Sequence, residues 1–140
     1  MPFREKSAWI MSAALFLGGI FYFRAVFSAW SEYGELLSPE IPPILAYTGF
    51  LIAIAIVGHI VTAALAPKDA DASLDEREQQ IFNRAGHCSS YVIASGIMMS
   101  LGLYLVSNNG DLLFYTVFAS LMVGQIAEYL WQILFYRTSV

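Results

Sequence analysis

Between two long apolar runs, residues 73–88 of the chain read SLDEREQQIFNRAGHC. Ser73 and Glu76 have the Ser-x-x-Glu spacing of a capping box, and acidic residues favour the positive end of a helix dipole. The spacing therefore predicts a helix that begins near Leu74. No helix breaker separates its polar start, residues 74–84, from the apolar run that follows. We expect one long helix whose first turns stand outside a membrane.

The apolar residues of the chain form four runs, each close to the ~20 residues needed to cross a bilayer core. The 140 residues are 58% hydrophobic and 13% charged, which is too apolar for a soluble domain of this size. We expect a single membrane domain over residues 1–140. Its fold class is an all-α integral membrane protein, a four-helix bundle with the third helix extended into the cytoplasm. The expected spans are residues 8–30, 44–66, 85–106 and 112–136.

Six of the seven basic residues lie at the two termini or in the second loop and the helix start that follows it. The first and third loops contain no Lys or Arg. Because short cytoplasmic loops are enriched in basic residues, both termini and the 73–84 segment should be cytoplasmic. The seventh, Arg24, lies near the far end of the first span, where we expect it to snorkel or to pair with Glu32 or Glu35.

Composition and motifs exclude several classes of function. Scattered basic residues do not form the patch that direct nucleic-acid binding requires. A single cysteine excludes an internal disulfide. The chain has no Gly-x-Gly-x-x-Gly, P-loop, Gly-x-Ser-x-Gly or His-Glu-x-x-His motif, so we expect no enzyme of these classes. It also lacks His-x₃-His and Glu-x-x-His spacings, so we expect neither a metal site nor a bound cofactor.

An intramembrane polar cluster is expected around the fourth span. Gln125, Glu128 and Gln132 share one helical face, and Glu128 is the only acid inside an expected span. At the helix rise, Glu128 lies roughly 12 Å and His59 roughly 10 Å from the cytoplasmic ends of their spans. We therefore expect His59 to contact Glu128, directly or through water. His87, near the start of the third span, should approach Gln132 or the lipid headgroups.

Three interpretations of this cluster stay open. The polar side chains can hold the helices together by hydrogen bonds. They can instead serve a small transporter or a proton-linked sensor that uses Glu128 and His59, because intramembrane acids often mark proton relays. A third interpretation is a cofactor-binding subunit that uses His59 and His87.

Small residues recur at helical spacing in two spans. Gly58, Thr62 and Ala66 share a face of the second span, and Gly96 and Ser100 share a face of the third. Such faces let a neighbouring helix approach closely. We expect them to form helix contacts and to support a homo-oligomer.

Residues 75–85 read Asp-Glu-Arg-Glu-x-x-Ile-x-x-Arg-Ala. This stretch resembles the signature of a family of small four-helix bacterial and archaeal membrane proteins of unknown function. In that family, Asp-Glu-Arg-(Glu/Asp)-x-x-Ile and a basic residue precede the third span. The resemblance implies a multi-pass protein of the prokaryotic cytoplasmic (inner) membrane that acts as the membrane partner of a small cytoplasmic regulator.

The favoured hypothesis is a non-enzymatic scaffold or regulatory partner in the lipid bilayer that binds a cytoplasmic protein through the 73–84 segment. The expected partner-binding residues are Asp75, Glu76, Arg77, Glu78 and Arg84. The simpler interpretation of the same residues is a solvated cap that orients the third helix, since charge runs are usually solvated faces.

Overall fold

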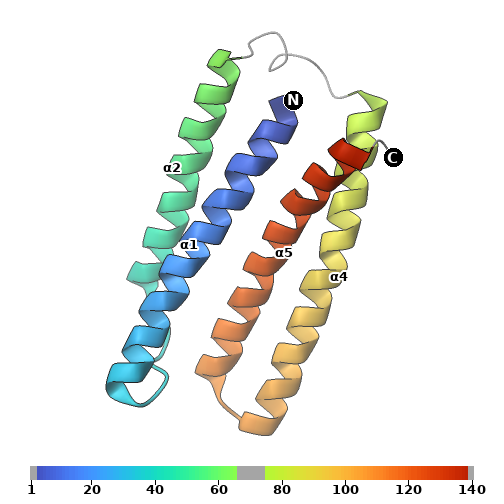
Figure 1. The fold of residues 1–140 in the computed structure, drawn as a ribbon. Coiled ribbons are helices and arrows are strands. Elements are labelled where there is room, and N and C mark those ends of the chain that lie inside the picture. The colour runs from blue at the N-terminus through green and yellow to red at the C-terminus, as the bar shows by residue number, and fades with distance from the viewer. Residues whose placement is uncertain (1–2, 66–74, 139–140) are drawn as a thin grey trace.

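A computed structural model of the chain describes residues 3–65 and 75–138, which form four helices (Figure 1). The helices are α1 (Phe3–Tyr33), α2 (Ile41–Leu65), α4 (Glu76–Ser107) and α5 (Gly110–Thr138). All four are long and apolar enough to cross a membrane. The expected all-α, four-helix architecture is therefore confirmed. So is the single long third helix, because α4 runs without a break through its polar start into its apolar part.

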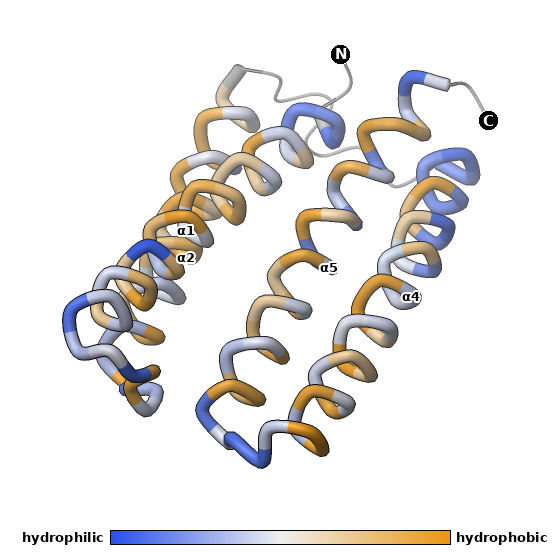
Figure 2. Tube along the Cα trace, turned by 60° about the horizontal axis from the view of Figure 1, so that its bottom comes forward, coloured by the Kyte–Doolittle hydropathy of each residue, from blue (hydrophilic) through white to orange (hydrophobic). Residues whose placement is uncertain are grey.

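The helices pack in the order α2–α1–α5–α4, with α2 and α4 as the outer members (Figure 1). Figure 2 shows the same order as two pairs, α1 over α2 and α5 beside α4. The start of α1, the end of α2, the start of α4 and the end of α5 lie together, which we call the terminal end. The opposite end, called the loop end, holds the 34–40 loop and the turn at residues 108–109.

Two glycines bring α4 and α5 close together. A Cβ added at Gly96 of α4 would lie 2.7 Å from Ser120 Cβ, and one added at Gly124 of α5 would lie 2.8 Å from Ile93 Cδ1. Ser100, on the same face of α4 as Gly96, is buried. The expected close approach at Gly96 and Ser100 is therefore confirmed, and the neighbour is α5 of the same chain.

Adjacent glycines let α1 pack on two sides. A Cβ at Gly18 would lie 3.0 Å from Tyr47 of α2, whereas one at Gly19 would lie 2.7 Å from Met122 of α5. Neighbouring residues on a helix point about 100° apart, so the two glycines serve different neighbours.

The small-residue face of α2 is also occupied within the chain. A Cβ at Gly58 would lie 2.7 Å from Ile10 Cγ2 of α1, and Thr62 is 5% exposed. Ala66, the third member of this face, lies outside the described residues. These small-residue faces therefore form contacts inside one molecule, and self-association of the chain stays a prediction.

The loop end is closed by local turn chemistry. Gly34 follows α1 with φ +73°, and Asn108 follows α4 with φ 51°, both in the left-handed region. Asn109 Oδ1 accepts a hydrogen bond of 2.9 Å from the Leu112 N–H and so caps the start of α5. Across the bundle, the Tyr115 hydroxyl donates to the Leu37 carbonyl at 3.2 Å. The connection between α4 and α5 is therefore a short turn at residues 108–109.

We predict that Gly96→Ala destabilises the fold, because the added methyl group meets Ser120 Cβ at 2.7 Å and the two helices must separate. Overpacking of this kind typically costs about 1–3 kcal/mol. Gly102→Ala is the matched control on the same helix, since nothing lies within 4 Å of its added Cβ. Thermal unfolding in mild detergent measures both variants. Equal stability of the two would contradict the close packing of α4 on α5.

Candidate functional site

Asp75 caps the polar start of α4. Its backbone is extended, at φ −78° and ψ 166°, and its Oδ1 accepts a hydrogen bond of 2.7 Å from the Glu78 N–H. The helix begins at Glu76, two residues later than the expected start near Leu74. Aspartate is among the strongest N-caps because its short carboxylate reaches the free N–H groups of the first turn. Ser73 of the expected capping box lies outside the described residues.

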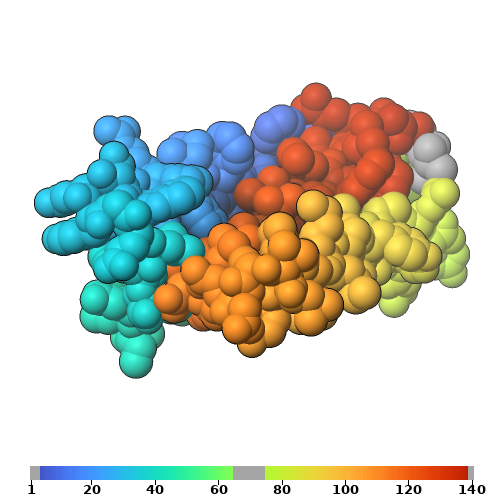
Figure 3. Space-filling model, turned by 90° about the horizontal axis from the view of Figure 1, so that it is seen from below, coloured from blue at the N-terminus to red at the C-terminus, as the bar shows by residue number. Residues whose placement is uncertain are grey.

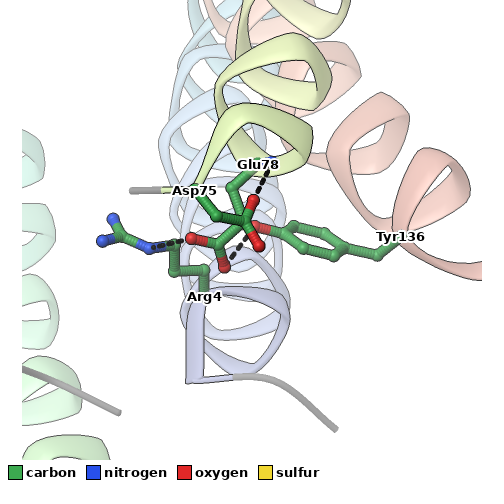
Figure 4. A network of polar contacts seen from close by, with 4 residues as sticks. All are labelled: Arg4, Asp75, Glu78 and Tyr136. Carbon is green, nitrogen blue, oxygen red and sulfur yellow. Dashed lines mark hydrogen bonds and ion pairs between the residues drawn. The ribbon is translucent and has the colours of Figure 1, made fainter. Parts of the chain in front are cut away.

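Glu78 ties three helices together at the terminal end (Figure 4). Its Oε2 forms an ion pair of 3.1 Å with Arg4 Nε of α1, and its Oε1 accepts a hydrogen bond of 3.3 Å from the Tyr136 hydroxyl of α5. The side chains of Arg4 and Glu78 are 26% and 20% exposed, so the pair is partly shielded from water. Glu78, expected to bind a partner, instead turns inward and fixes the start of α4.

A second ion pair joins the two ends of the described chain. Arg137 Nε lies 3.0 Å from Glu5 Oε1, and the Glu5 side chain is only 6% exposed. The Arg137 guanidinium also stands 5.5 Å from the centre of the Trp9 ring. A buried carboxylate is unfavourable without a cationic partner, so this pair holds α1 against α5.

The start of α4 has two distinct faces. The inward face buries Ile81 and Ala85, which are 1% and 0% exposed. Arg84 is exposed, yet its guanidinium stands 5.5 Å from the centre of the Phe135 ring in a cation–π contact. Phe82 is half-buried. Five further side chains of this segment are polar and exposed to solvent, and we call them the outer polar face: Glu76, Arg77, Gln79, Gln80 and Asn83.

The five expected partner-binding residues therefore separate into two groups. Asp75, Glu78 and Arg84 make contacts within the chain. Glu76 and Arg77 point outward, and neither forms an ion pair within residues 3–65 and 75–138.

His59 contacts α1 and not Glu128, so the expected pair is wrong. Its Nε2 lies 2.8 Å from Ser7 Oγ, and its Nδ1 lies 2.6 Å from the Ala55 carbonyl oxygen. A carbonyl only accepts, so Nδ1 carries the hydrogen and Nε2 can accept from the Ser7 hydroxyl. His59 and Glu128 lie at a similar depth along their helices. However, α2 packs mainly on α1, and α1 packs on α5, so the two residues belong to different helix pairs.

The fourth-span polar residues form a small intrahelical contact. Gln132 is 3% exposed, and its Nε2 donates to Glu128 Oε1 at 3.4 Å. Gln125 is exposed and belongs to the surface of α5. The transporter hypothesis thus loses the histidine that was expected to serve Glu128.

His87 does not hydrogen-bond to Gln132 in the described structure. It is exposed on α4, with its ring 5.0 Å from the Tyr91 ring in an edge-to-face arrangement. His59 and His87 lie on the two outer helices, and within the described ranges no group of three or more His, Cys, Asp or Glu is placed to hold a metal ion.

Arg24 is exposed on α1 and forms no ion pair with Glu32 or Glu35 in the described structure. The expected ion pair of Arg24 is therefore wrong, and its side chain faces outward.

Sequence reasoning missed four residues that hold the terminal end: Arg4, Glu5, Tyr136 and Arg137. The signal was a mixed-charge group just before the first span, Arg-Glu-Lys at positions 4–6. A carboxylate such as Glu5 at the edge of an apolar run requires a basic partner, which predicts an ion pair at this end.

Comparison of the chain with protein-family models, curated proteins and solved structures finds no match. The resemblance of residues 75–85 to a family signature therefore stays a prediction.

We predict that Glu78→Gln destabilises the protein by about 1 kcal/mol, because it removes a partly shielded ion pair while keeping the side-chain shape. Backbone amides of residues 76–84 should exchange hydrogen faster. The loss of stability should be smaller at high salt, because salt screens the ion pair in the unsubstituted protein. Glu76→Gln is the control on the same helical turn, with an exposed carboxylate. If both variants exchange alike, Glu78 does not fix the start of α4.

We also predict energetic coupling between Ser7 and His59. A double-mutant cycle with Ser7→Ala and His59→Phe should give about 0.6 kcal/mol, the average for hydrogen bonds between membrane helices. The corresponding cycle of His59→Phe with Glu128→Gln should give a value near zero. Unfolding in mixed detergent micelles measures both, and coupling only in the second cycle would contradict the observed packing of α2 on α1.

Proposed function

We propose that this chain is a non-enzymatic, multi-pass membrane protein that anchors a cytoplasmic protein at its terminal end. The outer polar face of α4 is the docking surface. One observation carries the proposal: the start of α4 is fixed on its inward side by Glu78, Ile81 and Ala85, while Glu76 and Arg77 point to solvent. A rigid helix with outward polar groups suits protein binding.

Helix length and charge support this membrane placement. α4 has 32 residues, about 48 Å at the helix rise, against a hydrocarbon core of ~30 Å. Its polar start therefore extends past the bilayer surface when its apolar part spans the core. Arg4, Arg77, Arg84 and Arg137 all belong to the terminal end, which favours a cytoplasmic location for that end.

The stability of the fold alone does not explain why the outer polar face carries charged residues. Exposed charges contribute only ~0–1 kcal/mol per pair, and Arg77 has no ion pair within the described ranges. Because the helix is already ordered, a partner that binds it avoids most of the entropy cost of folding a loop. The neighbouring opposite charges of Glu76 and Arg77 can set orientation and partner choice.

The test is gentle crosslinking in cells, purification in mild detergent and identification of bound proteins. Arg77→Ala should remove a specific cytoplasmic protein, with affinity falling by about tenfold or more, as for an arginine at the centre of an interface. Lys6→Ala is the matched control, since it removes one positive charge at the same end but from α1. Glu128→Gln should leave the partner bound.

Binding is then measured between the purified partner and the full chain in vesicles. Retention of the same partner by both Arg77→Ala and Glu76→Ala would overturn the proposal, and so would an equal loss with Lys6→Ala. Glu78→Ala is unsuitable here, because it disturbs the anchoring of α4 as well as its charge.

A further inference from the structure

A cleft of about 920 Å³ lies between α1 and α5 in the half of the molecule nearer the loop end. Its walls are mainly aromatic and aliphatic side chains: Phe16, Phe23, Phe27 and Trp30 of α1, with Met122 and Ile126 of α5. This volume is near the upper limit for small-molecule sites, which measure roughly 300–1,000 Å³. The shape and the lining suit a long apolar chain.

The cleft is lined by side chains on the outer surface of two helices that could span a membrane. Several lining side chains are among the most exposed apolar residues of their helices, including Phe16 at 57%, Phe27 at 60% and Val123 at 54%. In spanning helices, such residues face lipid. The lining of α1 from Phe16 to Trp30 extends about 21 Å at the helix rise, and one leaflet is about half of the ~30 Å core. An acyl chain from the surrounding leaflet can therefore lie along the cleft.

The loop end supplies polar groups at the mouth of the cleft. Glu35, just after α1, and Asn109, in the turn before α5, both line it. Figure 3 views the molecule from this end, and the segment after α1 and the turn before α5 lie on the visible face together with parts of α4 and α5. The loop end also carries three further acids, Glu32, Glu40 and Asp111. Arg24 is the nearest basic residue along α1. A carboxylate at the mouth and this acidic surrounding favour a headgroup with an ammonium group over an anionic headgroup, and only a primary ammonium has N–H groups to donate to the carboxylate.

We propose that the α1–α5 cleft binds a membrane phospholipid with a primary ammonium headgroup. The acyl chain lies between Phe16 and Trp30, and the ammonium group donates to the Glu35 carboxylate. The inference rests on the membrane placement proposed above but not on partner docking. Its test variants lie outside residues 75–85, so loss of lipid binding and loss of the cytoplasmic partner are separate results.

The test uses the full chain in phosphatidylcholine vesicles that contain a trace of diazirine-labelled lipid. Phosphatidylethanolamine and phosphatidylglycerol probes carry the same labelled acyl chain and differ only in the headgroup. After illumination, peptide mass spectrometry maps the labelled residues. The ethanolamine probe should label residues 16–30 and 112–126 preferentially, and about two- to fivefold more than the glycerol probe, as one exposed ion pair provides.

Two variants test the two ends of the site, each with a matched control. Glu35→Gln should abolish the preference for the ethanolamine probe, while Glu32→Gln, at an exposed acid outside the cleft, should keep it. Ala119→Phe fills the cleft and should lower labelling of its walls several-fold. Ala94→Phe, at an exposed position on α4, should not. Because Glu35 lies outside the helices, its substitution keeps the proposal testable even where Ala119→Phe unfolds the protein.

Three results would overturn the proposal. Equal labelling by the two probes would show that the protein does not recognise the ammonium headgroup. Labelling spread evenly over the exposed faces of all four helices would show that the cleft is not a lipid site. A crosslinked dimer joined through the cleft walls, sensitive to Ala119→Phe, would show that a second copy of the chain occupies it.

Discussion

The close approach of α4 and α5 is the constraint on which the rest of the structure depends. Inside a membrane, helix association cannot rely on the hydrophobic effect, so backbones must come close enough for dense van der Waals contact. Gly96 against Ser120 and Gly124 against Ile93 provide this contact. The same antiparallel register brings Tyr136 to Glu78 and Phe135 to Arg84. The charged start of α4 thus has a fixed position because glycines deeper in the helix set the register.

The central position of α1 determines which polar side chains contact one another. Gly18 lies against Tyr47 of α2 and Gly19 against Met122 of α5, so α1 packs on both helices. The contact between α2 and α5 is made by rings such as Tyr47 and Phe118. His59 on α2 consequently meets Ser7 on α1, and Glu128 on α5 finds Gln132 one turn away. His59 and Glu128 each have a hydrogen-bond partner nearby, which favours the structural interpretation of these two residues over a shared proton relay.

Properties that follow from local sequence were predictable, whereas lateral neighbours were not. Apolar length located the four helices, and the lack of a breaker after residue 84 predicted the continuous α4. Depth along a helix follows from its rise, so His59 and Glu128 could be compared in depth but not in lateral position. The lateral order of the helices depends on which face of α1 packs against each neighbouring helix. Likewise, Glu5 and Arg137 pair across 132 positions of the chain, a contact that no local pattern encodes.

The two ends of the molecule differ in the kind of interaction that holds them. At the terminal end, ion pairs from Glu5 and Glu78 link α1 to both α4 and α5. At the loop end, an apolar cleft lies beside ring contacts between Tyr22 of α1 and Phe118 of α5, and Tyr115 donates a hydrogen bond to the Leu37 carbonyl. A cross-linked polar end can present fixed side chains to a protein. An apolar end with an open cleft has surface that acyl chains can cover, and lipid there would fill space that the four helices leave open.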